Sequence, residues 1–141
     1  MTMRLAVDLT LGEYGHCAVS IVAPDDPNSF WSIGFYGTGR IYIEDEGREG
    51  CDFEPTASYD FTLKPERFPA VVDFVRKSAM KEHYSTLGFN CSSFATGLYR
   101  EATGETPPGS YANAILEKFA PKPPRRIHKS IMRRNAEKAQ A

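Results

Sequence analysis

The 141-residue sequence lacks the features of a membrane or exported protein. It has no apolar run near the roughly 20 residues that a membrane-spanning helix requires. Its first fifteen residues, MTMRLAVDLTLGEYG, lack the long apolar stretch and small-residue cleavage site of a secretory signal peptide. We therefore expect synthesis in the cytoplasm and no stable membrane insertion. Activity elsewhere, for example in a target periplasm, would require a specialised secretion system.

Cysteine is scarce, occurring only at positions 17, 51 and 91. No two cysteines form a C-x-x-C pair, so a structural zinc site is not expected. A disulfide framework is not expected in a chain without an export signal. Since the number is odd, at least one thiol should be free.

Charge is distributed unevenly along the chain. Residues 120–141 have a net charge of +6 and residues 1–119 of −7. No aromatic residue interleaves with the basic ones, so bases would find no stacking platform, and an acidic body disfavours nucleic acid as the main partner. We expect one domain over residues 1–119, followed by a solvated, partly disordered basic tail that begins with the Pro-rich 121–124.

Periodicity predicts a chain of strands followed by helices. The acidic segment 44–54 is expected to be a solvated loop. The fold class is therefore α+β, with an antiparallel sheet packed against two or three helices. The predicted strands cover 3–9, 16–23, 30–36, 40–43 and 58–63, and the predicted helices cover 66–81, 91–103 and 110–119.

Cys91 is the candidate nucleophile. Asn90 is a favoured N-cap residue, so Cys91 should lie in the first turn of a helix that ends at Gly104. The positive end of the helix dipole lowers the pKa of a thiol there, and the unpaired N–H groups can form an oxyanion hole. Cys91 precedes Phe94 by three residues and should point at the sheet. The alternative is an inert core cysteine.

His16 is the candidate base. It follows Gly15 at the start of a strand, where the backbone would fix its ring. The alternatives are His83, at the end of the first predicted helix, and His128, in the basic tail. A structural role for His16 is the competing interpretation.

The group that orients the imidazole is expected on the neighbouring strand. Ser32 is the candidate, with Tyr36 and Asn28 as rivals. Cys17 should lie on the face of the sheet opposite His16, in the core. Cys51 lies among acidic residues, which raise the pKa of a thiol, so it should not be reactive.

The order of these motifs resembles a known family. Gly15-His16 opens a strand, Phe30-Trp31-Ser32-Ile33-Gly34-Phe35-Tyr36 forms the next, and Asn90-Cys91-Ser92-Ser93-Phe94-Ala95 opens a helix. This order is similar to that of the circularly permuted NlpC/P60 papain-like hydrolases, which include the lecithin:retinol acyltransferase-like proteins. The resemblance spans about residues 3–118. It implies a papain-like fold in permuted order, Cys91 as nucleophile and His16 as base. Ser32 stands where many members have histidine, so a Cys–His dyad stays open.

The resemblance implies cleavage of an amide bond without metal or cofactor. The expected substrate is a peptide of bacterial peptidoglycan, cut by an amidase or endopeptidase. The small size is similar to that of type VI secretion effectors, toxins that are paired with an immunity protein. Three alternatives remain: a lipid-directed acyltransferase or phospholipase, a non-enzymatic binding module, and removal of ubiquitin-like modifiers.

Overall fold

The computed structural model covers the whole chain. The residues that it describes are 1–22, 25, 30–35, 41–46, 53–80 and 90–140.

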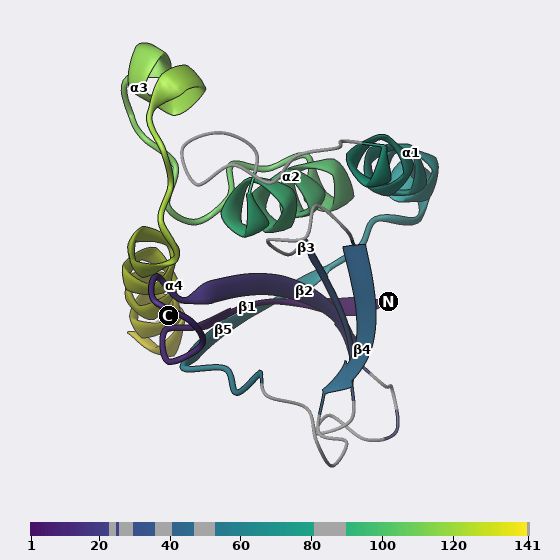
Figure 1. The fold of residues 1–141 in the computed structure, drawn as a ribbon, viewed down its shortest axis with the longest axis horizontal. Coiled ribbons are helices and arrows are strands. Elements are labelled where there is room, and N and C mark those ends of the chain that lie inside the picture. The colour runs from purple at the N-terminus through teal and green to yellow at the C-terminus, as the bar shows by residue number, and fades with distance from the viewer. Residues whose placement is uncertain (23–24, 26–29, 36–40, 47–52, 81–89, 141) are drawn as a thin grey trace.

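In these parts of the chain the sheet has five strands, all antiparallel, in the order β4-β3-β2-β1-β5 (Figure 1). The strands β1 to β4 are neighbours in chain order, and β5 returns to pair with the free edge of β1. The prediction of a loop over 44–54 is wrong at its start, because residues 44–46 belong to β4. The strands are β1 Thr2–Asp8, β2 His16–Val22, β3 Phe30–Phe35, β4 Ile41–Glu46 and β5 Ala57–Thr62.

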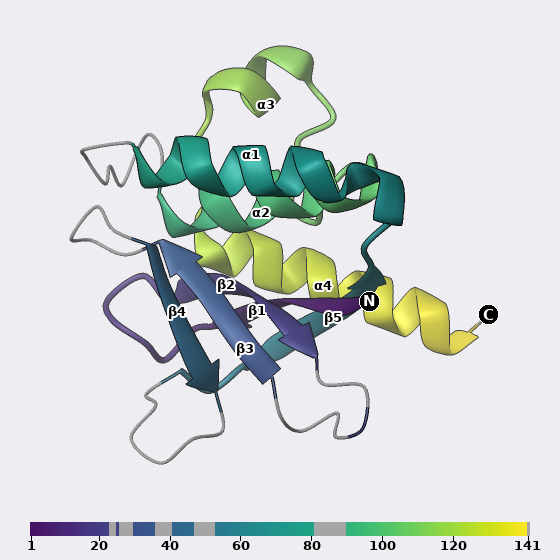
Figure 2. The ribbon, with the colours of Figure 1, turned by 90° about the vertical axis from the view of Figure 1, so that its right-hand side faces the viewer.

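Within the described residues, four α-helices follow the strands, one more than expected. Figures 1 and 2 show α1 and α2 stacked over one face of the sheet, while α4 packs on β1 and β5. In the described part of the chain, no helix is both long and apolar enough to cross a bilayer. The α+β class is confirmed. The helices are α1 Phe68–Ala79, preceded by the 3-10 turn Pro65–Arg67, then α2 Cys91–Thr103, α3 Ala114–Phe119 and α4 Pro124–Gln140.

Strict alternation along β1 and β2 builds the core. The odd-numbered residues of both strands face the helices, because successive side chains of a strand point to opposite faces. They meet the inward stripe of α2, in which Phe94 and Leu98 are fully buried. On the other face a smaller cluster forms from Ala6, Ala18 and Phe53.

The basic segment is part of this core, and the expectation of a partly disordered tail over 120–141 is wrong for residues 124–140. Ile127 and Ile131, four residues apart, share one face of α4 and are fully buried. Asn135 Nδ2 donates to Ser58 O at 2.8 Å. The other faces of the helix carry many cations. The composition of this segment is therefore strongly basic and does not reveal the apolar stripe. A domain boundary at residue 119 therefore does not hold.

We predict that Ile131→Ala destabilises the protein by about 2–5 kcal/mol, since it removes buried methylenes and leaves a cavity. Met132→Ala, a change at a neighbouring exposed side chain of the same helix, should change the free energy of unfolding by less than about 0.5 kcal/mol. Urea unfolding of both variants measures this. Equal, small effects would show that α4 is not part of the cooperative unit.

Candidate functional site

The start of α2 has the geometry that the sequence predicts. Asn90 is extended, with φ −140°, and its Oδ1 accepts hydrogen bonds from Ser92 N at 3.0 Å and Ser93 N at 3.1 Å. Cys91 is the first residue of the helix, and Gly104 ends it with φ 73°. The cap has a chemical consequence: the N–H groups of Ser92 and Ser93 are engaged by Asn90, so an expected oxyanion hole cannot use them in this conformation.

The side chain of Cys91 points at the sheet, as expected. It is 2% exposed and belongs to the core cluster that Phe94 and Ala95 also join. A thiol at this place lies at the positive end of the helix dipole, which favours its anionic form.

Cys17, on β2, is the residue that meets Cys91. It is fully buried, and its Sγ lies 3.5 Å from Ser92 Oγ, where either atom can donate. Burial, and then the hydrogen bond and charge of Cys91, raise the pKa of Cys17 well above its ordinary value. Cys17 therefore stays a neutral thiol at physiological pH, able to donate its S–H to an anionic Cys91.

His16 lies on the other face of the sheet. Its ring packs edge-on against Phe53, with centroids 5.8 Å apart and an interplanar angle of 84°. It belongs to the even-numbered set of β2 with Ala18 and Ser20, whereas Cys17 belongs to the odd-numbered set that faces α2. The structure thus does not bring His16 and Cys91 together. The prediction that Cys17 lies opposite His16, in the core, is confirmed.

Ser32 does not pair with His16 either. In the β2–β3 ladder Ser32 lies opposite Ser20, four residues along the strand from His16, or about 13 Å. The described part of the structure does not include the side chain of Ser32. The rivals Tyr36 and Asn28 lie outside the described residues.

Two further predicted positions, His83 and Cys51, also lie outside the described residues. His128, the remaining histidine, is half-buried on α4.

Asp8 is a polar residue that the sequence reasoning missed. It lies directly across the β1–β2 ladder from His16 and is fully buried. Its Oδ1 accepts from Thr10 N at 2.8 Å and from Thr10 Oγ1 at 2.6 Å, and its Oδ2 accepts from Glu54 N at 2.9 Å. Burial alone would raise the pKa of Asp8, but these hydrogen bonds outweigh it and lower the pKa. The signal was available, because β1 and β2 were predicted as consecutive strands.

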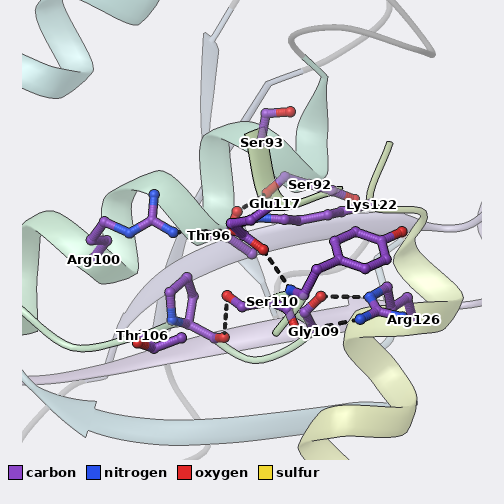
Figure 3. Close-up of polar contacts among 12 residues, drawn as sticks. Ser92, Ser93, Thr96, Arg100, Thr106, Gly109, Ser110, Glu117, Lys122 and Arg126 are labelled. Carbon is purple, nitrogen blue, oxygen red and sulfur yellow. Dashed lines mark hydrogen bonds and ion pairs between the residues drawn. The ribbon is translucent and has the colours of Figure 1, made fainter. Parts of the chain in front are cut away.

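A cleft of about 370 Å³ lies on the outer side of α2. Ser93 and Thr96 line it from the helix, on the side away from Cys91, and Glu117 and Lys122 line it from the α3 segment. Glu117 holds that segment in place: it accepts from Tyr111 N, pairs with Lys122 and lies 3.4 Å from Arg100 (Figure 3). The cleft and the thiol therefore occupy opposite sides of one helix.

Within the described residues, no group of three or more His, Cys, Asp and Glu side chains comes together as metal ligands would. The site that the structure assembles at α2 is a pair of thiols beside a serine hydroxyl.

Comparisons with known proteins found no relative: no family model, no curated protein and no solved structure matches the chain.

We predict that Asp8→Asn lowers stability at pH 7 by about 1–3 kcal/mol, because it disturbs a buried hydrogen-bonded carboxylate. The folded pKa of Asp8 lies below the unfolded one. Its contribution is therefore present above about pH 4 and is lost as the pH falls through the folded pKa. Urea unfolding from pH 2 to 7 should show a shallower acid dependence for Asp8→Asn. The matched variant Asp25→Asn, at an exposed carboxylate, should keep the wild-type slope.

We predict that iodoacetamide leaves Cys17 unmodified in the native protein at pH 8 and modifies it in urea. Burial and a raised pKa deny the reagent both access and thiolate. Peptide mass spectrometry after timed alkylation reads each cysteine separately. Native labelling of Cys17 as fast as in urea would contradict the buried position on β2.

Proposed function

We propose that this chain is a thiol-dependent hydrolase of amide bonds, with a papain-like fold in permuted order and Cys91 as nucleophile. The observation that supports it best is the position of Cys91. It is the first residue of a capped helix, and its thiol is turned onto the first residues of β2. The order of a His-bearing strand before a Cys-bearing helix is the order that the resemblance requires.

The proposed reaction transfers an acyl group through Cys91. The thiolate, favoured by the helix dipole and by the Cys17 S–H, attacks the amide carbonyl. A C–S bond forms, the C–N bond breaks, and a proton passes from the base to the leaving amine. Water, deprotonated by the same base, then cleaves the thioester and releases the acid. Cys17 acts here as a positioning residue, because it touches the nucleophile and not the substrate.

His16 is the proposed base, and the conformation described must change for it to serve. It is the first residue of β2, so the change needed is local: its pair with Asp8 and its packing against Phe53 must open. The preceding Gly15 has φ 82°, a conformation that glycine adopts readily. Opening these contacts would free the start of β2, so that the imidazole could turn toward Cys91.

The proposed substrates are peptides of bacterial peptidoglycan, and the proposed role is that of an antibacterial effector held in check by an immunity protein. Only the resemblance supports this substrate and this role. Neither of them requires a metal or another cofactor.

Lipid-directed acyl transfer is the second candidate, and one cavity favours it. A cavity of about 340 Å³ lies between α1 and the sheet, and most of the residues that line it are apolar, among them Met3, Ile21 and Val71. Leu98 also lines it, seven residues from Cys91 and about 10 Å along α2. The cavity could hold an acyl chain, and it lies against the helix that bears the thiol.

We predict that purified protein releases new fragments from bacterial cell-wall sacculi and that Cys91→Ala releases none. His16→Ala should reduce the rate by at least about 100-fold. His128→Ala, a half-buried histidine on α4, is the matched control and should keep most of the activity. Chromatography and mass spectrometry identify the fragments and the bond cut.

The same preparations are incubated with phospholipid esters. An acyl mass on Cys91 from lipid, without sacculus fragments, would select the lipid candidate. If Cys91 also resists alkylation at pH 6–8 while the protein stays folded, the hydrolase proposal fails and Cys91 is a core residue.

A further inference from the structure

The basic helix α4 forms one wall of a small cavity. The cavity has a volume of about 240 Å³, and its other wall is the loop at Gly109 and Ser110. The residues of α4 that line it occupy positions i, i+3, i+4 and i+7, so they share one face of the helix. They are Arg126, Lys129, Ser130 and Arg133.

In the part of the chain that the structure describes, three cations line this cavity and no acidic side chain does. Among the described residues, Lys129 and Arg133 form no ion pair, whereas the ion-paired cations elsewhere engage the carboxylates of β5, α1, α2 and α3. Residues 1–119 carry a net charge of −7, so this cavity is a positive site beside an acidic part of the chain.

Arg126 is fixed before any ligand arrives. Its Nε donates to Gly109 O at 2.6 Å and its Nη2 to Ser110 O at 3.3 Å, and the guanidinium lies 3.6 Å from the centroid of the Tyr111 ring. Figure 3 shows Arg126 reaching from α4 to this loop. A guanidinium has five N–H donors, so about three remain available. A positioned donor group loses little entropy on binding.

Gly109 keeps the loop close to α4. It has φ 83°, and a Cβ there would lie 3.0 Å from Ile127 Cγ1. Ser130, a residue that is 8% exposed, adds a hydroxyl that forms no side-chain hydrogen bond with the described residues. The cavity thus offers cations, fixed N–H donors and a hydroxyl within a concave surface.

We infer that this cavity, between the Gly109–Ser110 loop and α4, binds a phosphate group, carried either by inorganic phosphate or by a small phosphomonoester. Arginine and lysine donors converging from one side match the oxygens of such a group. The volume lies below the roughly 300 Å³ at which pockets for larger ligands begin. A nucleic acid would need a longer basic surface with aromatic platforms. This site is independent of the proposed hydrolase.

The test measures binding of inorganic phosphate and of glycerol 3-phosphate by isothermal titration calorimetry at constant ionic strength. The full chain should bind at least one of them saturably, with one site. Preference for the ester would identify an organic phosphate as the natural ligand, and equal binding would identify phosphate itself. The double variant Lys129→Gln/Arg133→Gln should weaken binding by tenfold or more, on the order expected for two lost charge-assisted contacts.

The matched control is Lys64→Gln/Arg125→Gln, which removes two exposed cations outside the cavity and changes the net charge equally. It should bind as wild type does. Circular dichroism establishes that both variants fold. Equal weakening by the two double variants, or no saturable binding to either anion, would overturn the site. Saturable binding of an oligonucleotide with none of either anion would also overturn it, in favour of a nucleic-acid surface.

Discussion

The register of the β1–β2 hairpin decides which face of the sheet each side chain occupies. The rest of the structure depends on this constraint. A shift of one residue in a strand exchanges every side chain between the two faces. With the observed register, Val7 pairs with Cys17 and Asp8 with His16. The first pair faces α2 and closes the core, and the second pair faces away. The same register that buries Val19 therefore also decides whether His16 or Cys17 faces Cys91.

The register is held from both of its ends. At the turn, Gly15 has φ 82°, and a Cβ there would lie 3.1 Å from Asp8 O and 3.3 Å from Pro124 Cβ. The turn is thus packed against the start of α4, and a side chain at this point would be strained. Farther along the strands, Leu5 and Val19 pair with each other and are fully buried. A slip would expose both of them, at a cost of about 1.5–3 kcal/mol for each side chain.

Much of this architecture could be predicted from local signals. Asn90 and Gly104 bracket α2 as capping chemistry requires, because each acts through hydrogen bonds within a few residues. The β-strands, too, were predicted to within a few residues. What could not be predicted is long-range. The apolar stripe of α4 is short, and its two isoleucines, Ile127 and Ile131, are fully buried. Its contribution to stability depends on the surface of β1 and β5 that it covers.

The candidate site shows the same division. A motif at the start of a helix predicted the direction of Cys91, and alternation predicted that Cys17 and His16 lie on opposite faces. Those two statements already imply that only one of the two residues reaches α2. The apolar weight of Cys17, Val19 and Ile21 against His16, Ala18 and Ser20 favours the odd-numbered set, by hydrophobic burial alone.

The pairing of Cys17 with Cys91 ties stability to reactivity. A helix whose first residue is buried gains packing energy from that residue, but a nucleophile must be reached by its substrate. In the conformation described, Cys91 is 2% exposed, so its burial favours stability over access by a substrate. In the proposed hydrolase, opening the Asp8–His16 end of the ladder would release the start of the central strand β2 and leave the Leu5–Val19 pair intact. For the proposed hydrolase, the smallest conformational change that could bring His16 and Cys91 together is therefore a local opening at the start of β2.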